Sequence, residues 1–252
     1  MRVLSGVVWM VLTANAVEPA LAQTLAQRIA RAPDGTVRLS FAARPGVCGN
    51  GRNITTTRRG SDEWENGCES GPVHVALSVQ GHAVRGIRTY VGGRWRPGAA
   101  DVTDLGAIPA RDAADYLLAL AVGLDTESGK DAIFPATLAD SVEVWPALLK
   151  IARNQAVSRS TRRQAVFWLG QAASEVATRG LDSLVREDTV DRSVREQAVF
   201  ALSQRPRDEG VPVLVRVART NPDPGIRKKA LFWLSQSDDP RALALFEELL
   251  TR

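Results

Sequence analysis

The sequence predicts an α+β protein, in which a small disulfide-stapled β domain precedes an α-solenoid of about four helix pairs. One observation is a short apolar phrase that begins at Ala165, Ala198 and Ala230, at intervals of 33 and 32 residues. Self-similarity at a period of 20–50 residues is typical of repeat arrays. A second observation is the alternation of apolar and polar residues before residue 106, in a region that also holds both cysteines. We therefore expect three segments, with bounds 1–22, 23–106 and 107–252.

Residues 1–22 have the layout of a secretory signal peptide. Arg2 precedes an apolar run over 3–12, and small residues end the segment at Ala22. The run is shorter than the ~20 apolar residues that a membrane span needs. An uncleaved anchor is the alternative. We expect cleavage after Ala22, a mature chain in the periplasm or outside the cell, and no stable membrane span after cleavage.

Cys48 and Cys68 are the two cysteines of the chain. An even number of cysteines in an exported chain, separated by a loop rich in Gly and Asn, indicates a disulfide. The bridge closes a ring of 21 residues, which on chain-entropy grounds stabilises the fold by ~3 kcal/mol.

The formal net charge is +4 and the isoelectric point is near 9.5. A basic protein can favour nucleic acid or an anionic surface. An exported protein rarely meets nucleic acid, so we expect no nucleic-acid partner. A cytosolic location would reopen that possibility.

The region before residue 106 alternates with the period of two that is typical of half-buried strands. Residues 36–41 form one such stretch, and a hairpin follows with its turn near Gly81 and a bulge expected at Gly86. A leading helix is expected over 23–31. The predicted strands cover 36–41, 73–80, 84–91 and 101–105.

A catalytic site has weak support in this region. His74 and His82 are the only histidines, and four acidic residues lie between positions 62 and 69. Metal sites need three or four ligands at workable spacing, and these residues are scattered. The chain has no nucleophile elbow, phosphate loop or His-Glu-Xaa-Xaa-His motif. We expect no catalytic residues, metal or cofactor. The alternative is a hydrolase or transferase that brings a histidine to a carboxylate and a nucleophile.

From residue 107 the apolar period changes to that of helices. We expect a helix over 111–122, a connecting loop over 135–141, and helices that begin behind caps at Ser158, Asp191 and Asp223. Second helices, two with proline in the first turn, are expected at 144–153, 181–187, 211–219 and 243–250. The predicted buried stripes are Thr161, Ala165, Trp168, Leu169; Val194, Ala198, Ala201, Leu202; and Ile226, Ala230, Trp233, Leu234.

This pattern resembles the HEAT repeat, in particular its phycobilisome-lyase type. The cap, the Val/Ile-Arg pair and the spaced alanine and leucine are complete at 191–202 and 223–234, and degenerate at 158–169. The resemblance covers about 142–252. It implies a stack of helix pairs that serves as a binding scaffold, with structural roles for the Asp and Arg. It implies no bilin chemistry, because no motif here matches bilin attachment.

Two sets of residues are candidates for partner binding. Phe167, Phe200 and Phe232 lie two positions after each buried alanine, about 200° around the helix. They either pack on a neighbouring element or form an exposed aromatic ladder for a protein or peptide. The recurrent arginines either bridge between repeats through the cap aspartates or bind an acidic partner. These arginines are Arg162, Arg195 and Arg227.

The sequence therefore favours a non-catalytic scaffold that binds another protein or peptide through the solenoid surface. It leaves the identity of the partner and the oligomeric state open.

Overall fold

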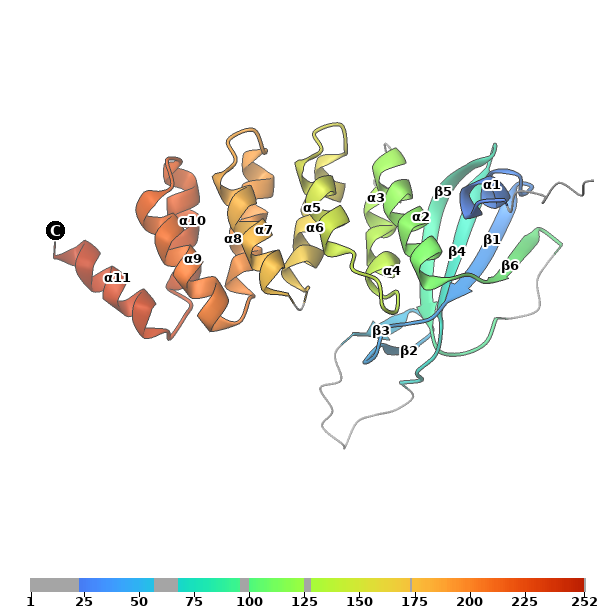
Figure 1. Cartoon of the computed structure of the whole chain (residues 1–252), viewed down its shortest axis with the longest axis horizontal. Coiled ribbons are helices and arrows are strands. Elements are labelled where there is room, and N and C mark those ends of the chain that lie inside the picture. Colours follow the sequence, from blue (N-terminus) through green and yellow to red (C-terminus); the bar gives the residue numbers. More distant parts are fainter. Residues whose placement is uncertain (1–22, 57–67, 96–99, 125–127, 173, 252) are drawn as a thin grey trace, which may run out of the picture.

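The computed structural model describes residues 23–56, 68–95, 100–124, 128–172 and 174–251. The predicted signal peptide (1–22) and the acidic residues Asp62, Glu63 and Glu65 lie outside this range. A β region lies at one end of the molecule, and helices extend from it in a row toward the C terminus (Figure 1). This arrangement is consistent with the predicted α+β class.

Four strands form one sheet in the order β5-β4-β1-β6. The central strands β1 and β4 are antiparallel, β5 is antiparallel to β4, and β6 is parallel to β1. Helix α1 (Leu25–Ala30) precedes the sheet, and a Thr24 capping box begins it. The strands are β1 (Gly35–Phe41), β4 (Val73–Gln80), β5 (Ala83–Val91) and β6 (Val102–Ala107).

Burial alternates along β1 and β4, as the period of two predicts. The apolar set on one face includes Val37, which pairs with Leu77, and both side chains are fully buried. The predicted hairpin and its bulge are present, because the β4–β5 register shifts where Ser78 pairs with Gly86 and Val79 with Val84.

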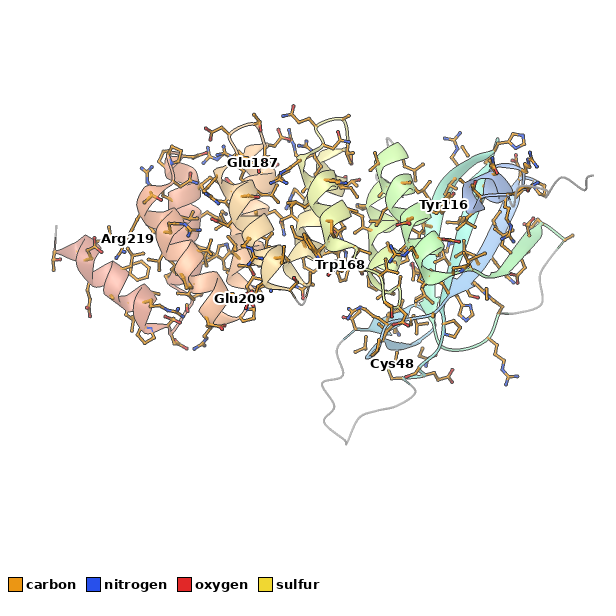
Figure 2. The ribbon with its side chains drawn as sticks, in the orientation of Figure 1. Cys48, Tyr116, Trp168, Glu187, Glu209 and Arg219 are labelled. Atoms are coloured by element: carbon orange, nitrogen blue, oxygen red, sulfur yellow. A yellow bond between two sulfur atoms is a disulfide. The ribbon has the colours of Figure 1, made fainter. Side chains whose placement is uncertain are left out.

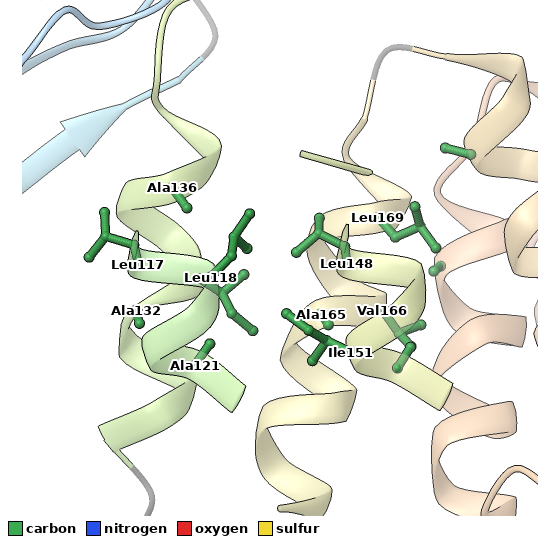
Figure 3. Close-up of a cluster of buried hydrophobic side chains, with 14 of the residues drawn as sticks. Leu117, Leu118, Ala121, Ala132, Ala136, Leu148, Ile151, Ala165, Val166 and Leu169 are labelled. Carbon is green, nitrogen blue, oxygen red and sulfur yellow. The ribbon is translucent and has the colours of Figure 1, made fainter. Parts of the chain in front are cut away.

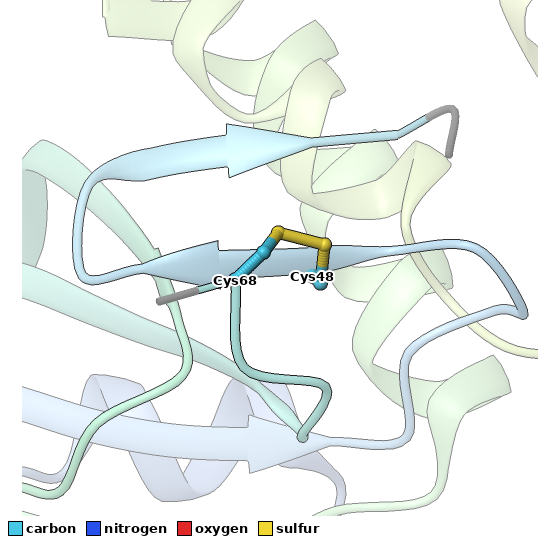
Figure 4. The surroundings of a disulfide bond; sticks show 2 residues. All are labelled: Cys48 and Cys68. Carbon is cyan, nitrogen blue, oxygen red and sulfur yellow. A yellow bond between two sulfur atoms is a disulfide. The ribbon is translucent and has the colours of Figure 1, made fainter. Parts of the chain in front are cut away.

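The predicted disulfide between Cys48 and Cys68 is present, with 5.2 Å between the two Cα atoms (Figure 4). Cys48 opens a small antiparallel hairpin of β2 (Cys48–Asn50) and β3 (Asn53–Thr55). Backbone pairing of Gly49 with Glu69 and of Gly51 with Val91 attaches this hairpin to the end of β5. The disulfide therefore joins β2 to the segment at Cys68 and Glu69, next to the backbone pairing of Gly49 with Glu69.

The helices after residue 107 stack in two rows that form a solenoid-like region. Helices α4, α6, α8 and α10 contact one another in succession, and we call them the first-helix row. Helices α2, α5, α7, α9 and α11 form the second-helix row. Their bounds are α2 (Ala110–Gly123), α3 (Ser128–Asp131), α4 (Ile133–Thr137), α5 (Trp145–Arg153), α6 (Arg159–Gly170), α7 (Glu175–Arg186), α8 (Arg192–Ser203), α9 (Arg207–Thr220), α10 (Pro224–Leu234) and α11 (Pro240–Leu250).

The predicted stripes form the core between the rows, apart from Trp168 and Trp233, which are half-buried. Figure 3 shows Leu118 of α2 pointing toward Leu148 of α5, with Leu169 of α6 beyond, while Leu117 points to the opposite side of α2. Burial of one such side chain stabilises the fold by about 1.5–3 kcal/mol. Because each helix covers its neighbour, the core runs along the whole row.

All three predicted cap residues occupy the N-cap position. The Ser158 hydroxyl accepts a hydrogen bond from the Thr161 amide, and the Asp223 carboxylate accepts one from Gly225 at 2.8 Å. The prediction was wrong for the side chain of Asp191, which caps no amide and instead pairs with Arg162.

Several helix starts differ from those predicted. The expected loop over 135–141 contains the end of α4, because Pro135 lies within the first turn, where its missing N–H is not needed. Helix α7 begins at Glu175 rather than near residue 181, behind a Ser174 cap. Helix α9 begins at Arg207, so Pro212 lies inside it and not in its first turn. The Pro212 side chain is exposed there.

Hydrogen bonds join the β region to the helices. The Arg44 amide donates to the Leu138 carbonyl at 2.8 Å, and the Asp140 amide donates to the Ala42 carbonyl at 2.9 Å. The Arg44 guanidinium also donates through Nε to the carbonyl of Thr137 at 3.0 Å. A search of the described residues finds no helix with the length and apolar character needed to cross a bilayer.

Candidate protein-binding surface

Two of the recurrent arginines bridge between successive helices of the first-helix row. Arg162 is 5% exposed and pairs with Asp191 at the start of α8. Arg195 is placed in the same way, with Nη2 3.2 Å from a carboxylate oxygen of Asp223 at the start of α10. These contacts favour the bridging role over the anion-binding role.

Arg227 differs from the other two. Its Nη1 donates to the carbonyl oxygens of Asn221 and Pro222, at 2.8 and 3.1 Å, in the segment just before its own helix. It therefore connects α10 to Asn221, the C-cap of α9, and does not bridge two helices of the first-helix row.

The three phenylalanines lie in aromatic clusters along the first-helix row. Phe232 is 53% exposed, while Phe167 and Phe200 are half-buried. The ring of Phe200 lies 4.9 Å from Trp233 on the next helix, and Phe232 lies 5.0 Å from the same indole. We call Phe200, Phe232 and Trp233 the C-terminal aromatic cluster. Its rings pack on each other, and the side chain of Phe232 still leaves apolar surface exposed.

A similar group lies nearer the β region. The ring of Phe134 stacks on Trp168 at 5.0 Å, and Phe167 meets the same indole edge-on at 5.1 Å (Figure 2 labels Trp168). The two groups repeat the same design, an indole between two phenylalanine rings.

The middle helix of the row interrupts this design. Where α6 has Trp168 and α10 has Trp233, α8 has Ala201, which is buried. Gly170 approaches it so closely that a Cβ on Gly170 would lie 2.9 Å from the Ala201 side chain. The small residues at this point let α6 and α8 pack closely.

A second residue of the middle repeat also differs from its equivalents in the flanking repeats. The residue after the recurrent glutamine is Ala172 in one repeat and Ser237 in another, but Arg205 in the middle one. Arg205 is 9% exposed, and its guanidinium donates to the carbonyls of Gly170 at 3.2 Å and Ser174 at 3.0 Å. Arg205 thus satisfies the carbonyl of Gly170 at the C-terminal end of α6, where the helix dipole also favours a cation, and the carbonyl of the α7 N-cap residue, Ser174.

Arg205 is held by two further side chains. Its Nε donates to the Thr178 hydroxyl at 2.8 Å, and its Nη2 donates to Glu209 at 2.8 Å. Hydrogen bonds from Thr178 and then from Arg205 lower the pKa of Glu209. The network fixes the turn between α6 and α7 to the start of α9, near the labelled Glu209 in Figure 2.

The two flanking repeats keep open cavities near the C-terminal ends of the first helices. The N-terminal cavity, of about 270 Å³, is lined by residues that include Arg44, Trp145, Trp168 and Gln171. The C-terminal cavity, of about 240 Å³, is lined by residues that include Ser203, Gln204, Trp233 and Ser237. Among the described residues, the buried indole N–H groups of Trp145, Trp168 and Trp233 find no acceptor.

Charged residues of the second-helix row pair with one another. Arg153 of α5 donates to Glu187 just after α7 at 2.9 Å, and Arg219 of α9 reaches Glu248 of α11 at 2.5 Å. Figure 2 labels Glu187 and Arg219 at two places along the stack. Asp182 lies between two arginines in the same way. These groups hold neighbouring helices together.

The two histidines do not form a catalytic group with the described residues. His82 lies in the β4–β5 turn, and its Nδ1 is 3.0 Å from the Ala30 carbonyl. The His74 ring lies 4.8 Å from Trp95, and burial lowers the pKa of His74, opposed by the charge of Asp104. Within the described ranges, no three His, Cys, Asp or Glu residues are grouped so that they could hold a metal.

The predicted set omitted Arg205, Arg44 and the two tryptophans as surface residues. A signal for Arg205 was present, because aligning the repeats shows that Ala201 and Arg205 replace a tryptophan and a small residue together. Arg44 carries no such signal, since its contact is with a residue 93 positions away.

Comparison with curated proteins finds none that matches this chain. The family model of HEAT repeats matches residues 184–252, which covers the helices from the end of α7 onward. This match supports the resemblance drawn from the repeated motif, and the C-terminal part of the chain is similar to HEAT repeats.

Proposed function

We propose that the mature chain is a non-catalytic scaffold of the periplasm or cell envelope, which holds another protein or peptide on its first-helix row. HEAT repeats are generally protein-interaction scaffolds, and residues 184–252 match them. In this proposal residues 23–106 form a β domain and 107–252 a domain of about four helix pairs. The likeness to the phycobilisome-lyase type concerns the form of the repeats only.

The exposed part of the C-terminal aromatic cluster carries the proposal. Phe232 is 53% exposed on a folded helix, and the indole of Trp233 supports it from one side. Large aromatic side chains held in place by their neighbours dominate the energy of many protein interfaces. The second-helix row offers less, because its charged groups pair between helices.

Export is part of the same proposal. The signal-like layout of residues 1–22 and the disulfide between Cys48 and Cys68 support an oxidising compartment. N-terminal sequencing of the protein recovered from the producing cell tests it. The expected first residue is Gln23, and an intact Met1 would contradict cleavage.

Capture from a cell-envelope extract tests the scaffold. Oxidised residues 23–252 serve as bait, and proteins retained by wild type are compared with those retained by Phe232→Ser. We expect the partner to be lost, with affinity at least about tenfold lower, the change expected when an interface aromatic worth about 1.4 kcal/mol or more is removed.

Leu243→Ser is the matched control. Leu243 is 56% exposed, is apolar like Phe232, and lies on α11 in the second-helix row. We expect it to retain the partner. Equal retention by wild type and Phe232→Ser, with both variants folded, would place the binding surface elsewhere.

A further inference from the structure

Three successive first helices end in the same way. Their last residues are Thr137 in α4, Gly170 in α6 and Ser203 in α8, spaced 33 residues apart. The first two carbonyls each accept from an arginine. Arg44 of the β region donates to Thr137 at 3.0 Å, and Arg205 of the following repeat donates to Gly170 at 3.2 Å.

The third carbonyl has no such partner. No described side chain donates to the carbonyl of Ser203, because Ser237 occupies the place that Arg205 holds one repeat earlier. The C-terminal cavity of about 240 Å³ lies there, bounded by Ser203, Trp233 and Ser237.

The acceptors around this place also correspond. In the middle repeat Arg205 donates to the carbonyls of Gly170, Ala172 and Ser174, and the residues 33 positions later are Ser203, Arg205 and Arg207. Arg241 already donates to the carbonyl of Arg207 at 3.0 Å. The carbonyls of Ser203 and Arg205 remain without a side-chain donor among the described residues.

Some features of this place suit a cation, and two arginines that line the cavity oppose one. The cavity lies at the C-terminal end of α8, where the helix dipole is negative. The Trp233 ring borders the cavity and can face a guanidinium group. Asp238 follows Ser237 in the chain and is 97% exposed. Its ion pair with Arg207 is long, with 4.0 Å between the nitrogen and the oxygen. The opposing charges are Arg205 and Arg207, which both line the cavity. Arg205 is paired with Glu209 at 2.8 Å, and Arg207 is 68% exposed and long enough to turn toward water.

We propose that the C-terminal cavity binds an arginine side chain of the partner protein, in the manner in which Arg205 fills the equivalent place within the chain. This rests on the proposed scaffold function. Arginine suits the place better than lysine, because its planar fork can donate to two carbonyls at once. The cavity lies beside the C-terminal aromatic cluster, since both include Trp233.

A capped peptide, acetyl-Gly-Gly-Arg-Gly-Gly-amide, tests the proposal on ¹⁵N-labelled, oxidised residues 23–252. Its twin with citrulline in place of arginine has nearly the same shape without the charge. We expect the arginine peptide to shift the indole N–H resonance of Trp233 saturably, with millimolar half-saturation, and the Trp168 resonance to stay unchanged. The citrulline peptide should produce no saturable shift. No shift of Trp233, or equal shifts with both peptides, would overturn the proposal.

Ser237→Arg supplies the missing side chain within the chain. We expect it to abolish the peptide-induced shift and to raise the thermal midpoint by roughly 2–4 °C, as one net charged hydrogen bond would in a chain of this size. Ser237→Ala is the control that should leave both unchanged. A Ser237→Arg variant that folds and still responds to the peptide would contradict the proposed position.

Partner capture separates this inference from the scaffold proposal. If Phe232→Ser loses the partner while Ser237→Arg retains it, the scaffold stands and the arginine site is wrong for that partner. If both variants retain it, the scaffold surface itself is wrong, whatever the peptide does. Loss in both, with retention by Ser237→Ala, supports both proposals.

Discussion

The sheet and the helical stack use the chain in opposite ways. In the sheet, β1 pairs with β4 and β6, so Val37 lies beside Leu77 and Thr103, far away in the sequence. In the stack, each helix packs mainly on the helices that come one or two positions before or after it in the chain. The sheet thus requires several distant segments at once, whereas the helices can be added one neighbour at a time.

This difference shows where damage should stay local. Loss of one contact in the sheet should weaken all the strands that pair with one another there. Loss of one contact in the stack weakens the two repeats that share it and leaves distant repeats intact. The two regions should therefore respond differently to changes of the same size.

Matched core substitutions should show the largest effect. Leu77→Ala in β4 and Leu234→Ala in α10 each remove a side chain that is at most 1% exposed. Each should destabilise its region by about 2–5 kcal/mol through lost burial and a cavity. Hydrogen exchange should show Leu77→Ala loosening β1, β4 and β5 together, and Leu234→Ala loosening only α8 to α11. If Leu234→Ala also lowered protection across the sheet, the two regions would be one cooperative unit.

Removal of the disulfide should come next. Cys48→Ala with Cys68→Ala removes the covalent bridge between β2 and the segment that precedes β4. We expect a loss of ~3 kcal/mol in the β region, measured by denaturant unfolding. Wild type under reducing conditions is the control for the substitutions themselves and should lose a similar amount. Protection of α8 to α10 should be unchanged, and a loss there would show that the staple stabilises the stack as well.

The smallest effect should come from the cap of the last helix. Hydrogen bonds from the Arg241 side chain and then from its amide lower the pKa of Asp239 from 3.8 to about 2. Because the folded pKa lies below the unfolded value, the stabilisation is complete above pH 3.8 and is lost as the pH falls through about 2.

Asp239→Asn should remove that pH dependence. We expect faster exchange of the α11 amides at neutral pH, and a flatter fall of the thermal midpoint between pH 3.8 and about 2. Asp238→Asn is the control, because its carboxylate is 97% exposed and caps nothing. An identical acid profile in Asp239→Asn and wild type would show that this cap contributes nothing to acid stability.

The sequence patterns predicted the elements whose signals are local. Alternation located β1, β4 and β5, and the spacing of Ala165, Ala198 and Ala230 located α6, α8 and α10. The start of α7 was misplaced because its first turn lacks apolar spacing, although the connection before it spans only residues 171–174. The short helices α3 and α4 were missed because a helix of four or five residues is too short to show a helical period in its sequence.

The surface was predicted less well, because side-chain partners depend on packing. The sequence allowed Arg162 to face a ligand or Asp191, and only the arrangement of α6 beside α8 decides between these roles. The exposure of Phe232 likewise depends on the neighbours of α10. By contrast, the joint replacement at Ala201 and Arg205 was visible in the repeats, and only its geometry was missing.

The hydrogen bonds of Arg44 have a consequence for how such a chain can change in length. With Arg44 donating to Thr137 and Leu138, the β region covers the N-terminal end of the helical stack as another repeat would. Helix pairs could therefore be inserted or deleted between α6 and α10 without changing the contacts between the β region and α4. The β region in this sense caps one end of the stack, and the number of helix pairs that follow it is free to vary.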